Sequence, residues 1–225
     1  MRIVAFGDVH QHPEQCGKIP GLDACDYFLV HGDLTNFGGR EAAARVIDSL
    51  RSYCPRVFAQ TGNLDRKSAS DFLSAEGINL HGQARLLSKG DDRLVVIGLG
   101  ASNPTPFFTP NELSEEVMAA ILDQAWQQAR ALVPDGAAMP TLLLSHAPPY
   151  GGQLDRLRNG RHVGSKAVRT FIEKHQPALC VCGHIHEAKG QDRLGATVVF
   201  NPGAFAQGGW VEIEVEAGSV HARLF

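Results

Sequence analysis

The stretch MRIVAFGDVH, residues 1–10, joins a short apolar run to a polar turn. Arg2–Phe6 has the apolar character of a buried β-strand, and a glycine and an aspartate follow it. Two further apolar runs, Tyr27–Val30 and residues 56–60, are likewise followed closely by glycine and polar residues. Residues 40–52, between those two runs, carry apolar side chains at helical spacing. This stretch and its repeats therefore predict strands that alternate with helices, as in a sheet covered by helices.

Similar patterns continue to the C-terminus. Further strands are predicted at residues 78–80, 84–88, 93–99, 141–145, 178–182, 197–200, 210–215 and 220–224, and a helix at 165–175. Thr109-Pro-Asn-Glu112 has the spacing of a capping box with proline at the first helical position. It predicts a helix that runs from there to Leu132. Because no repeat, low-complexity segment or linker interrupts the chain, we expect one domain over residues 1–225.

Composition excludes several classes of protein. The chain has 225 residues with 21 Lys and Arg against 24 Asp and Glu, a net charge of −3, and it has no basic run. Nucleic-acid and anionic-membrane binders depend on clustered basic residues, so neither partner is expected. No segment approaches the ~20 apolar residues of a membrane span. The N-terminus lacks the pattern of a secretory signal, and the five cysteines are an odd number. We therefore expect a cytoplasmic protein with reduced, buried thiols.

Five loops carry Asp, Asn or His directly after a predicted strand. They are Gly7-Asp8-Val9-His10, Gly32-Asp33-Leu34-Thr35-Asn36, Gly62-Asn63-Leu64-Asp65, Ser145-His146-Ala147-Pro148-Pro149 and Gly183-His184-Ile185-His186-Glu187. In open α/β sheets, ligands bind outside the carboxyl ends of the strands. The five loops are therefore expected to converge at one edge, although they are far apart in the sequence.

The side chains of these loops form a set of metal ligands. Asp8, Asp33, Asn63 and the four histidines of these loops supply two carboxylates, one amide oxygen and four imidazoles. Oxygen and nitrogen donors without a thiolate suit hard or borderline divalent ions. Seven donors exceed the needs of one tetrahedral ion, but they fit two ions if one carboxylate bridges them. Two ions ~3.5–4 Å apart hold a phosphate group and supply a hydroxide nucleophile.

The order GD-x-H, GD, GN, H and GH-x-H resembles the calcineurin-like metallophosphoesterases, especially their compact bacterial and archaeal members. The resemblance extends from Asp8 to Asn201-Pro202-Gly203. It implies a four-layer α/β/β/α sandwich, in which two mixed sheets are flanked by helices. It also implies two divalent ions (Mn²⁺, Fe²⁺, Zn²⁺ or Ni²⁺) and in-line attack of a metal-bridging hydroxide on phosphorus.

The resemblance assigns a role to each ligand position. The first ion would be bound by Asp8, His10 and His186. The second ion would be bound by Asn63, His146 and His184. Asp33 would bridge the two ions, and Asp33 and Asn63 are also catalytic positions by this resemblance.

One position departs from the family pattern. The third motif of the family is usually Gly-Asn-His followed by an acid, whereas this chain has Leu64 in place of that histidine. The histidine normally protonates the leaving oxygen, and such help is typically worth ~10²–10⁴ in rate. Some compact relatives without it are similar to phosphodiesterases acting on activated esters. We therefore expect a small phosphate-ester substrate, with diesters preferred over monoesters.

Two alternatives stay open. At least one relative, a retromer subunit, looks like a protein-binding scaffold, so a non-catalytic scaffold that binds a protein partner is the first alternative. A nuclease of the same superfamily is the second, and the absence of Lys and Arg runs argues against it. The filled set of ligand positions argues against the scaffold.

Residues 158–162 form a polar loop between the predicted strand 141–145 and the predicted helix 165–175. Arg161 could pair with a phosphate oxygen, and His162 could contact substrate or replace the missing catalytic acid. A solvated loop without such roles is the alternative. Asn36 or Asp65 could orient the ligating imidazoles from behind. Phe107 and Phe108 could wall a pocket, but they are expected to pack in the core, and His31 is expected to have a packing or surface role.

Overall fold

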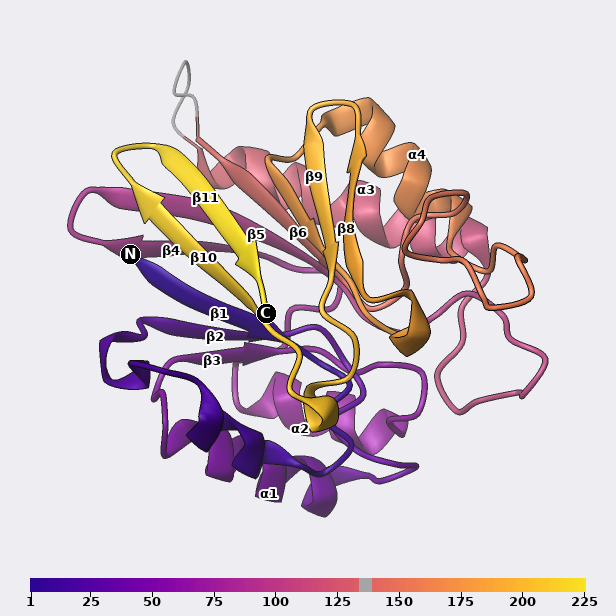
Figure 1. The fold of residues 1–225 in the computed structure, drawn as a ribbon, viewed down its shortest axis with the longest axis horizontal. Coiled ribbons are helices and arrows are strands. Elements are labelled where there is room, and N and C mark those ends of the chain that lie inside the picture. The colour runs from indigo at the N-terminus through magenta and orange to yellow at the C-terminus, as the bar shows by residue number, and fades with distance from the viewer. Residues whose placement is uncertain (134–138) are drawn as a thin grey trace.

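A five-stranded sheet contains the N-terminal strand in the computed structural model, which describes residues 1–133 and 139–225 (Figure 1). Its order is β11-β10-β1-β2-β3. The bounds are β1 (Arg2–Phe6), β2 (Tyr27–Val30), β3 (Val57–Ala59), β10 (Val211–Glu216) and β11 (Ser219–Leu224). The strands β1, β2 and β3 are parallel, and β10 and β11 extend the sheet, with β10 antiparallel to β1. The carboxyl ends of the three parallel strands therefore meet at one edge.

A six-stranded sheet packs against the first one, in the order β4-β5-β6-β7-β9-β8. Its strands are β4 (Ala84–Lys89), β5 (Asp92–Leu99), β6 (Thr141–Ser145), β7 (Leu179–Val181), β8 (Gly190–Leu194) and β9 (Thr197–Asn201). The four central strands are parallel, whereas β4 and β8 form antiparallel edges. Both sheets are thus mixed, as the sequence predicted.

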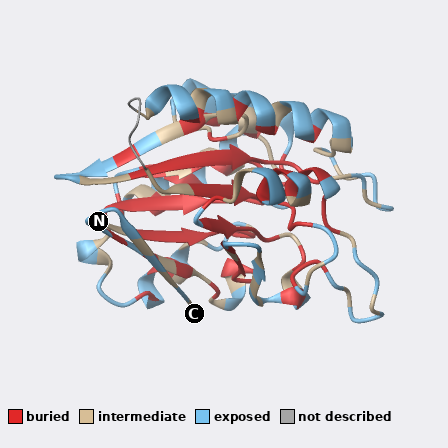
Figure 2. Cartoon of the chain, turned by 90° about the horizontal axis from the view of Figure 1, so that it is seen from above, coloured by how far each residue is buried: buried red, intermediate tan, exposed pale blue. Residues whose placement is uncertain are grey.

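Helices cover the outer face of each sheet. On the first sheet lie α1 (Arg40–Arg51) and α2 (Lys67–Ala75), and on the second lie α3 (Glu115–Leu132) and α4 (Lys166–His175). Short 3₁₀ helices are η1 (Pro13–Lys18), η2 (Leu22–Ala24), η3 (His186–Ala188) and η4 (Phe205–Gln207). The strands are largely buried and the helices show an exposed outer side (Figure 2). The predicted four-layer α/β/β/α sandwich is confirmed.

The alternation of side chains along β1 connects two hydrophobic cores. Val4 and Phe6 pack on the side of α1 and α2, whereas Ile3 and Ala5 pack between the two sheets. Successive side chains of a strand point to opposite faces, so a strand with a core on each side is apolar throughout. Burying each large apolar side chain contributes roughly 1.5–3 kcal/mol to folding.

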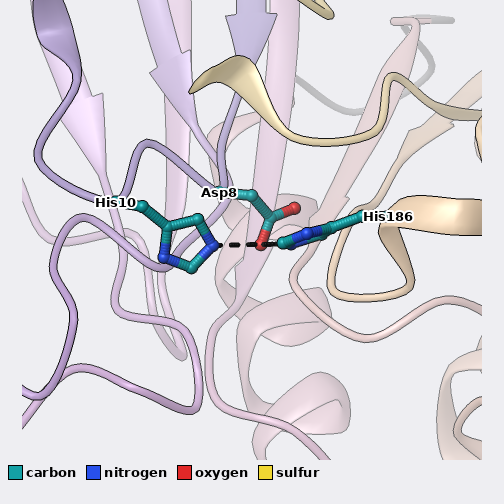
Figure 3. Close-up of side chains that lie close together, drawn as sticks. All are labelled: Asp8, His10 and His186. Atoms are coloured by element: carbon teal, nitrogen blue, oxygen red, sulfur yellow. Dashed lines mark hydrogen bonds and ion pairs between the residues drawn. The ribbon is translucent and has the colours of Figure 1, made fainter. Parts of the chain in front are cut away.

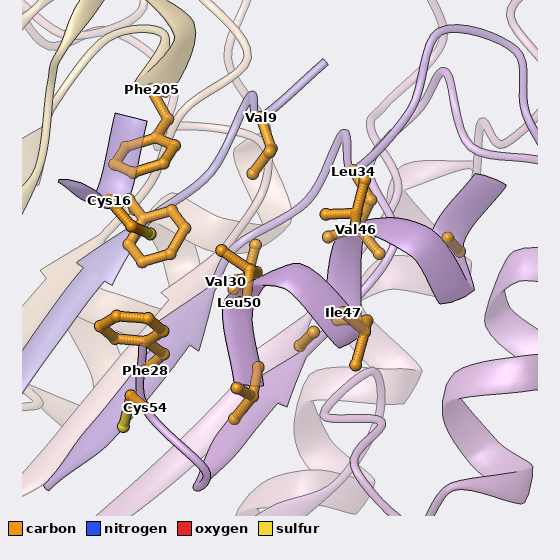
Figure 4. Close-up of a cluster of buried hydrophobic side chains, with 14 of the residues drawn as sticks. Val9, Cys16, Phe28, Val30, Leu34, Val46, Ile47, Leu50, Cys54 and Phe205 are labelled. Carbon is orange, nitrogen blue, oxygen red and sulfur yellow. The ribbon is translucent and has the colours of Figure 1, made fainter. Parts of the chain in front are cut away.

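Aromatic stacking anchors the C-terminal segment to the first sheet. The ring of Phe6 stacks on Phe205 with centroids 4.1 Å apart, and it meets Phe28 edge-on at 5.2 Å. Val46 and Leu50 of α1 belong to the same cluster (Figure 4). The segment after β9 is thereby fixed beside the end of β1, where the first ligand loop begins.

Most predicted elements are present with small shifts at their ends, but two predictions are wrong. Residues 78–80 form no strand and make only an isolated bridge between Asn79 and Ala59. The Thr109 amide does donate to the Glu112 carboxylate (2.8 Å), as in a capping box. The helix nevertheless begins at Glu115, because Ser114 is its N-cap and accepts from the Val117 amide.

Two further observations bear on the expectations from composition. All five cysteines, which lie in the described part of the chain, are free thiols, and four of them are buried. Among residues 1–133 and 139–225, no helix combines the length and apolar character needed to cross a membrane.

Candidate metal centre

The loops after five strands meet at one edge of the sandwich, and backbone hydrogen bonds connect them. The Asp8 amide donates to the Gly32 carbonyl (2.9 Å), which links the loops after β1 and β2. The Gly183 amide donates to the His146 carbonyl (3.0 Å), which links the loops after β7 and β6. The His184 amide donates to Asp8 Oδ2 (3.0 Å) and so joins the two sheets. The predicted convergence of the loops is present.

Asp8, His10 and His186 form the first group of potential metal ligands (Figure 3). One ligand atom from each lies within 4.8 Å of the others. His186 Nε2 is 3.2 Å from Asp8 Oδ1 and 3.5 Å from His10 Nε2. Two imidazole nitrogens and a carboxylate oxygen thus face a common point.

Asp8, Asp33 and His146 form the second group, with the same spacing of ligand atoms, and all three residues are buried. His146 Nε2 lies 3.7 Å from Asp33 Oδ1 and 3.0 Å from Asn63 Oδ1. The ring of His184 is 5.2 Å from that of His146, between centroids. All seven predicted ligands are therefore in one cluster. Asp8 is common to both groups, and the bridging role of Asp33 stays a prediction.

The amide of Asn63 is held with its oxygen toward this cluster. Asn63 Nδ2 donates to Thr109 Oγ1 (3.0 Å), which leaves Oδ1 facing His146. The Thr109 hydroxyl in turn donates to the Glu112 carboxylate (2.6 Å). The loop after β5 thus fixes a ligand of the first sheet, a contact that the sequence did not predict.

Asp65 joins two ligand loops through their backbone. Its fully buried carboxylate accepts from the amides of Leu34 and Thr35, from the Thr35 hydroxyl and from the Gly62 amide, at 2.7–3.0 Å. Asp65 therefore orients the loops that carry Asp33 and Asn63, whereas the sequence suggested that it orients an imidazole. Asn36 Nδ2 contacts the His10 carbonyl at 3.5 Å.

The backbone of the cluster adopts an unusual conformation. Asp8, His10, Asp33 and His184 have φ angles of 51°, 48°, 46° and 67°. Residues other than glycine rarely adopt positive φ, and such strain of roughly 1–3 kcal/mol per residue concentrates at functional sites. Four of the seven predicted ligands therefore lie in backbone that the surrounding fold must hold in place.

Burial controls protonation in the cluster. Burial lowers the pKa values of His10, His146 and His184, so these imidazoles are neutral at pH 7, the form that binds metal. Burial also raises the pKa of Asp33, and the charges of Asp8 and Asp65 add to that effect. For Asp8, burial opposes ionisation, but the contact with His186 and the nearby imidazoles lower its pKa. A cation would stabilise both carboxylates as anions.

His31 is a buried neighbour of the ligands for which the sequence predicted only a packing or surface role. It is fully buried at the end of β2, its ring centroid is 6.1 Å from that of His146, and burial lowers its pKa to about 4. A Cβ on Gly7 or Gly183 would overlap its ring. The glycines at the strand ends therefore make room for this imidazole, and its position directly before Gly32 is the signal in the sequence.

A buried carboxylate oxygen without a hydrogen-bond partner indicates that the cluster is suited to cations. Asp8 Oδ1 forms no hydrogen bond with the described residues, and it lies 3.2 Å from His186 Nε2 as an ion pair. Unpaired buried polar atoms are costly, so they need a ligand or another explanation. The donors are oxygen and nitrogen atoms, which suit borderline divalent ions. The residues present thus fit the metal sites that the sequence implied.

The remaining predicted residues surround the cluster differently. Leu64 is half-buried, and its amide donates to Asp33 Oδ1 (2.8 Å). His162 Nδ1 contacts the buried Asp155 carboxylate (2.8 Å), and its ring borders a cavity that contains none of the seven ligands. Arg161 is exposed and its amide donates to Asn159. Phe107 and Phe108 are 81% and 90% exposed, so the expectation that they pack in the core is wrong.

Known proteins resemble this chain over most of its length. A family profile described as metallophosphoesterase, calcineurin superfamily, matches residues 137–224. The uncharacterized protein MJ1162 of Methanocaldococcus jannaschii is 33% identical over 211 residues, which cover 90% of this chain and 88% of that protein.

Solved structures share the fold. TT1561 of Thermus thermophilus superposes with a TM-score of 0.70 at 19% identity, over 99% of this chain and 97% of that one. A structure described as a novel archaeal phosphodiesterase superposes with a TM-score of 0.50 at 10% identity, over the full length of both chains. Sequence, fold and ligand cluster agree, and this chain belongs to the metallophosphoesterases of the calcineurin superfamily.

Proposed function

We propose that this protein is a phosphoesterase that uses two divalent ions and prefers phosphodiesters. The observation that carries the proposal is the convergence of five side chains on two adjacent groups of ligand atoms that share Asp8, with Asn63 and His184 beside His146. Asp8 Oδ1 is buried without a hydrogen-bond partner among the described residues. Bound ions would neutralise the charge of a phosphate group and activate water for attack on phosphorus.

In this proposal, each residue of the ligand cluster and its supporting loops has a separate role. Asp8 and Asp33 supply the negative charge that holds the ions, and the imidazoles, which bind metal in their neutral form, complete the ligand sets. Asn63 contributes a neutral oxygen, which the Thr109 hydroxyl orients by accepting from its amide nitrogen. Asp65 keeps the loops of Asp33 and Asn63 in register through four hydrogen bonds. Such positioning lets the site act without rearrangement.

The preference for diesters is proposed from Leu64. A hydrocarbon side chain cannot protonate a leaving oxygen, so the reaction favours esters whose leaving group is stable as an anion. His162, the predicted substitute acid, is held by Asp155 beside a separate cavity. In this proposal the metal cluster carries the reaction, and His162 does not protonate the leaving oxygen.

The test compares bis(4-nitrophenyl) phosphate with 4-nitrophenyl phosphate. Protein stripped with EDTA is expected to hydrolyse neither ester, and added Mn²⁺ is expected to restore hydrolysis, with the diester faster. Asp33→Asn and His184→Ala should lose at least ~10²-fold in rate, since each removes a ligand. Arg45→Gln, an exposed position on α1, is the matched control and should keep its activity.

Two results would contradict the proposal. Hydrolysis by the metal-stripped protein at the rate of the reconstituted one would remove the role of the ions. Stoichiometric Mn²⁺ binding without hydrolysis of either ester would favour the alternative of a scaffold that keeps the ligand cluster but binds a protein partner.

A further inference from the structure

A cavity of about 390 Å³ lies beside β8 and the start of α4. Its wall is formed by the segment after β6, which runs from Pro149 to Arg156, together with His162. Cavities that bind small molecules typically measure ≈ 300–1,000 Å³. None of the seven candidate metal ligands borders it. The cavity is therefore large enough for a small ligand and separate from the metal centre.

The charged side chains at this cavity are mainly basic. Arg156, Arg169 and Arg193 all border it. Arg169 is engaged by Glu173 (2.8 Å) and by the Tyr150 carbonyl (2.9 Å). Arg156 and Arg193 form no ion pair with any residue in the described ranges, unlike Arg2, Arg51, Arg56, Arg158 and Arg169. Arg193 Nη1 donates to the Ala196 carbonyl at 3.4 Å, which leaves its other N–H groups for a ligand. Because guanidinium groups bind carboxylates and phosphates through paired N–H donors, Arg156 and the remaining donors of Arg193 can hold an anion.

The one acidic side chain that borders the cavity among the described residues is occupied by backbone donors. Asp192 Oδ2 accepts from the Gln153 amide (2.8 Å), and Asp192 Oδ1 accepts from the amide of Arg193 (2.8 Å). Its carboxylate thus joins the loop to β8, and it forms no ion pair with Arg156 or Arg193. The charge facing the cavity is net positive, although the whole chain carries −3.

A buried carboxylate makes the wall of the cavity rigid. Asp155 is fully buried and accepts from the amides of Gly151, Gly152 and Gly164 and from His162. His162 in turn packs edge-on against Tyr150, with ring centroids 5.9 Å apart. A loop held by this many contacts presents its side chains in a fixed arrangement, which reduces the entropic cost of binding.

Apolar side chains form the rest of the lining. Leu154 and Val199 are buried under the cavity, and Leu194 is half-buried at its side. We propose that this cavity binds a small organic phosphate, with the phosphate between Arg156 and Arg193 and its apolar part against Leu154 and Leu194. The proposal is independent of the function assigned to the metal centre.

The test measures binding to metal-stripped protein by calorimetry in EDTA, so that the metal centre cannot bind the anion through ions. The probes are phenyl phosphate, inorganic phosphate and phenol. Phenyl phosphate is expected to bind one site at least about ten-fold more tightly than either fragment, because only it uses both the arginines and the apolar lining. Its affinity should fall as salt concentration rises.

Variants connect the binding to the cavity. Arg156→Gln combined with Arg193→Gln should weaken phenyl phosphate binding at least about ten-fold, since charge-assisted hydrogen bonds are lost. Arg45→Gln on α1 should leave the affinity unchanged. Equal affinity of the double variant and the wild type, or phenol binding as tightly as phenyl phosphate, would overturn the proposal. Because no turnover is measured, neither outcome depends on the activity of the metal centre.

Discussion

Gly7 is a residue where the packing around the metal centre leaves little room. The three atoms nearest to a Cβ at this position all belong to the imidazole of His31, which is completely buried. Forcing extra atoms into a packed interior typically costs ~1–3 kcal/mol. We predict that Gly7→Ala lowers the free energy of unfolding by at least about 2 kcal/mol, measured by urea denaturation.

A double variant separates this contact from other effects at Gly7. His31→Ala removes the ring that the new Cβ meets, so Gly7→Ala and His31→Ala together should destabilise by less than the sum of the single changes. Gly17→Ala is the control, because only Tyr53 Oη lies near its Cβ, at 3.6 Å, and it should change stability by no more than about 0.5 kcal/mol. Additive single effects would contradict the overlap.

The side chain at position 64 affects the rate of ester hydrolysis and not the packing of the protein. Its side chain is half-buried and its amide holds Asp33, so a different side chain can be placed there without loss of the backbone contact. We predict that Leu64→His raises hydrolysis of 4-nitrophenyl phosphate in the Mn²⁺-loaded protein about ten-fold or more, because an imidazole can protonate the leaving oxygen. Leu64→Gln, which cannot donate a proton as an acid, should give no such gain. Equal rates for both variants would show that position 64 does not serve as the acid.

At the scale of elements, the loop between β5 and α3 supports the ligand cluster through one carboxylate. Glu112 accepts from the hydroxyls of Thr105 and Thr109 (both 2.6 Å) and from the Thr109 amide. Burial of Glu112 alone would raise its pKa, but these hydrogen bonds lower it from 4.5 to about 2. The stabilisation from the ionised carboxylate is therefore present above pH 4.5 and is lost as pH falls through about 2.

Glu112→Gln tests this pH dependence. At pH 7 the variant should be less stable by about 1 kcal/mol, a modest value because the carboxylate is partly solvated. The difference should shrink as the pH falls from about 4.5 towards 2, as measured by urea denaturation at each pH. Glu216→Gln at the exposed end of β10 is the control for charge alone. A difference that stays constant over this range would exclude a role for ionised Glu112.

The same loop shows what sequence patterns can and cannot predict. The strands β1, β2 and β6 are apolar runs whose predicted bounds match the structure. Thr109-Pro-Asn-Glu112 has the local signature of a helix start, yet Glu112 uses its carboxylate to close a turn over Asn63. The strand β8 has the sequence GQDRL and lies at the edge of its sheet. Its polar residues lack the apolar pattern from which a buried strand is predicted. Local sequence patterns predict helices and strands, whereas contacts between distant loops determine which partners a side chain such as Glu112 binds.

The metal cluster was predictable for a related reason. Its ligands follow strands directly, so strand order brings Asp8 and Asp33 to one edge of the first sheet, and the packing of the second sheet on the first adds His146. The supporting contacts were not predictable, because Asp65 and Thr109 act through loops whose course depends on the packed structure. The exposure of Phe107 was not predictable either, because its loop has no periodic sequence pattern that indicates which side chains are buried.

On the scale of the whole molecule, the ligand cluster joins the two sheets. Asp8, Asp33 and Asn63 follow strands of the first sheet, whereas His146 and His184 follow strands of the second. Ions bound between them would cross-connect the two halves of the sandwich, and they would bind only to the folded chain. A ligand that binds only the native state stabilises it by about 2.7 kcal/mol at a concentration 100 times its Kd.

Added Mn²⁺ is therefore predicted to raise the melting temperature of the EDTA-treated protein by roughly 2–4 °C per kcal/mol of binding energy, as expected for a chain of this length. Calorimetric melting with increasing Mn²⁺ measures the rise. Asp33→Asn and His146→Ala should each abolish most of it, although one lies on the first sheet and the other on the second, because each removes a ligand from the shared cluster. His221→Ala on β11 should keep the full rise. If the rise survives loss of the second-sheet ligand but not of the first, the ions are held by one sheet alone, and the cluster does not join the two halves of the molecule.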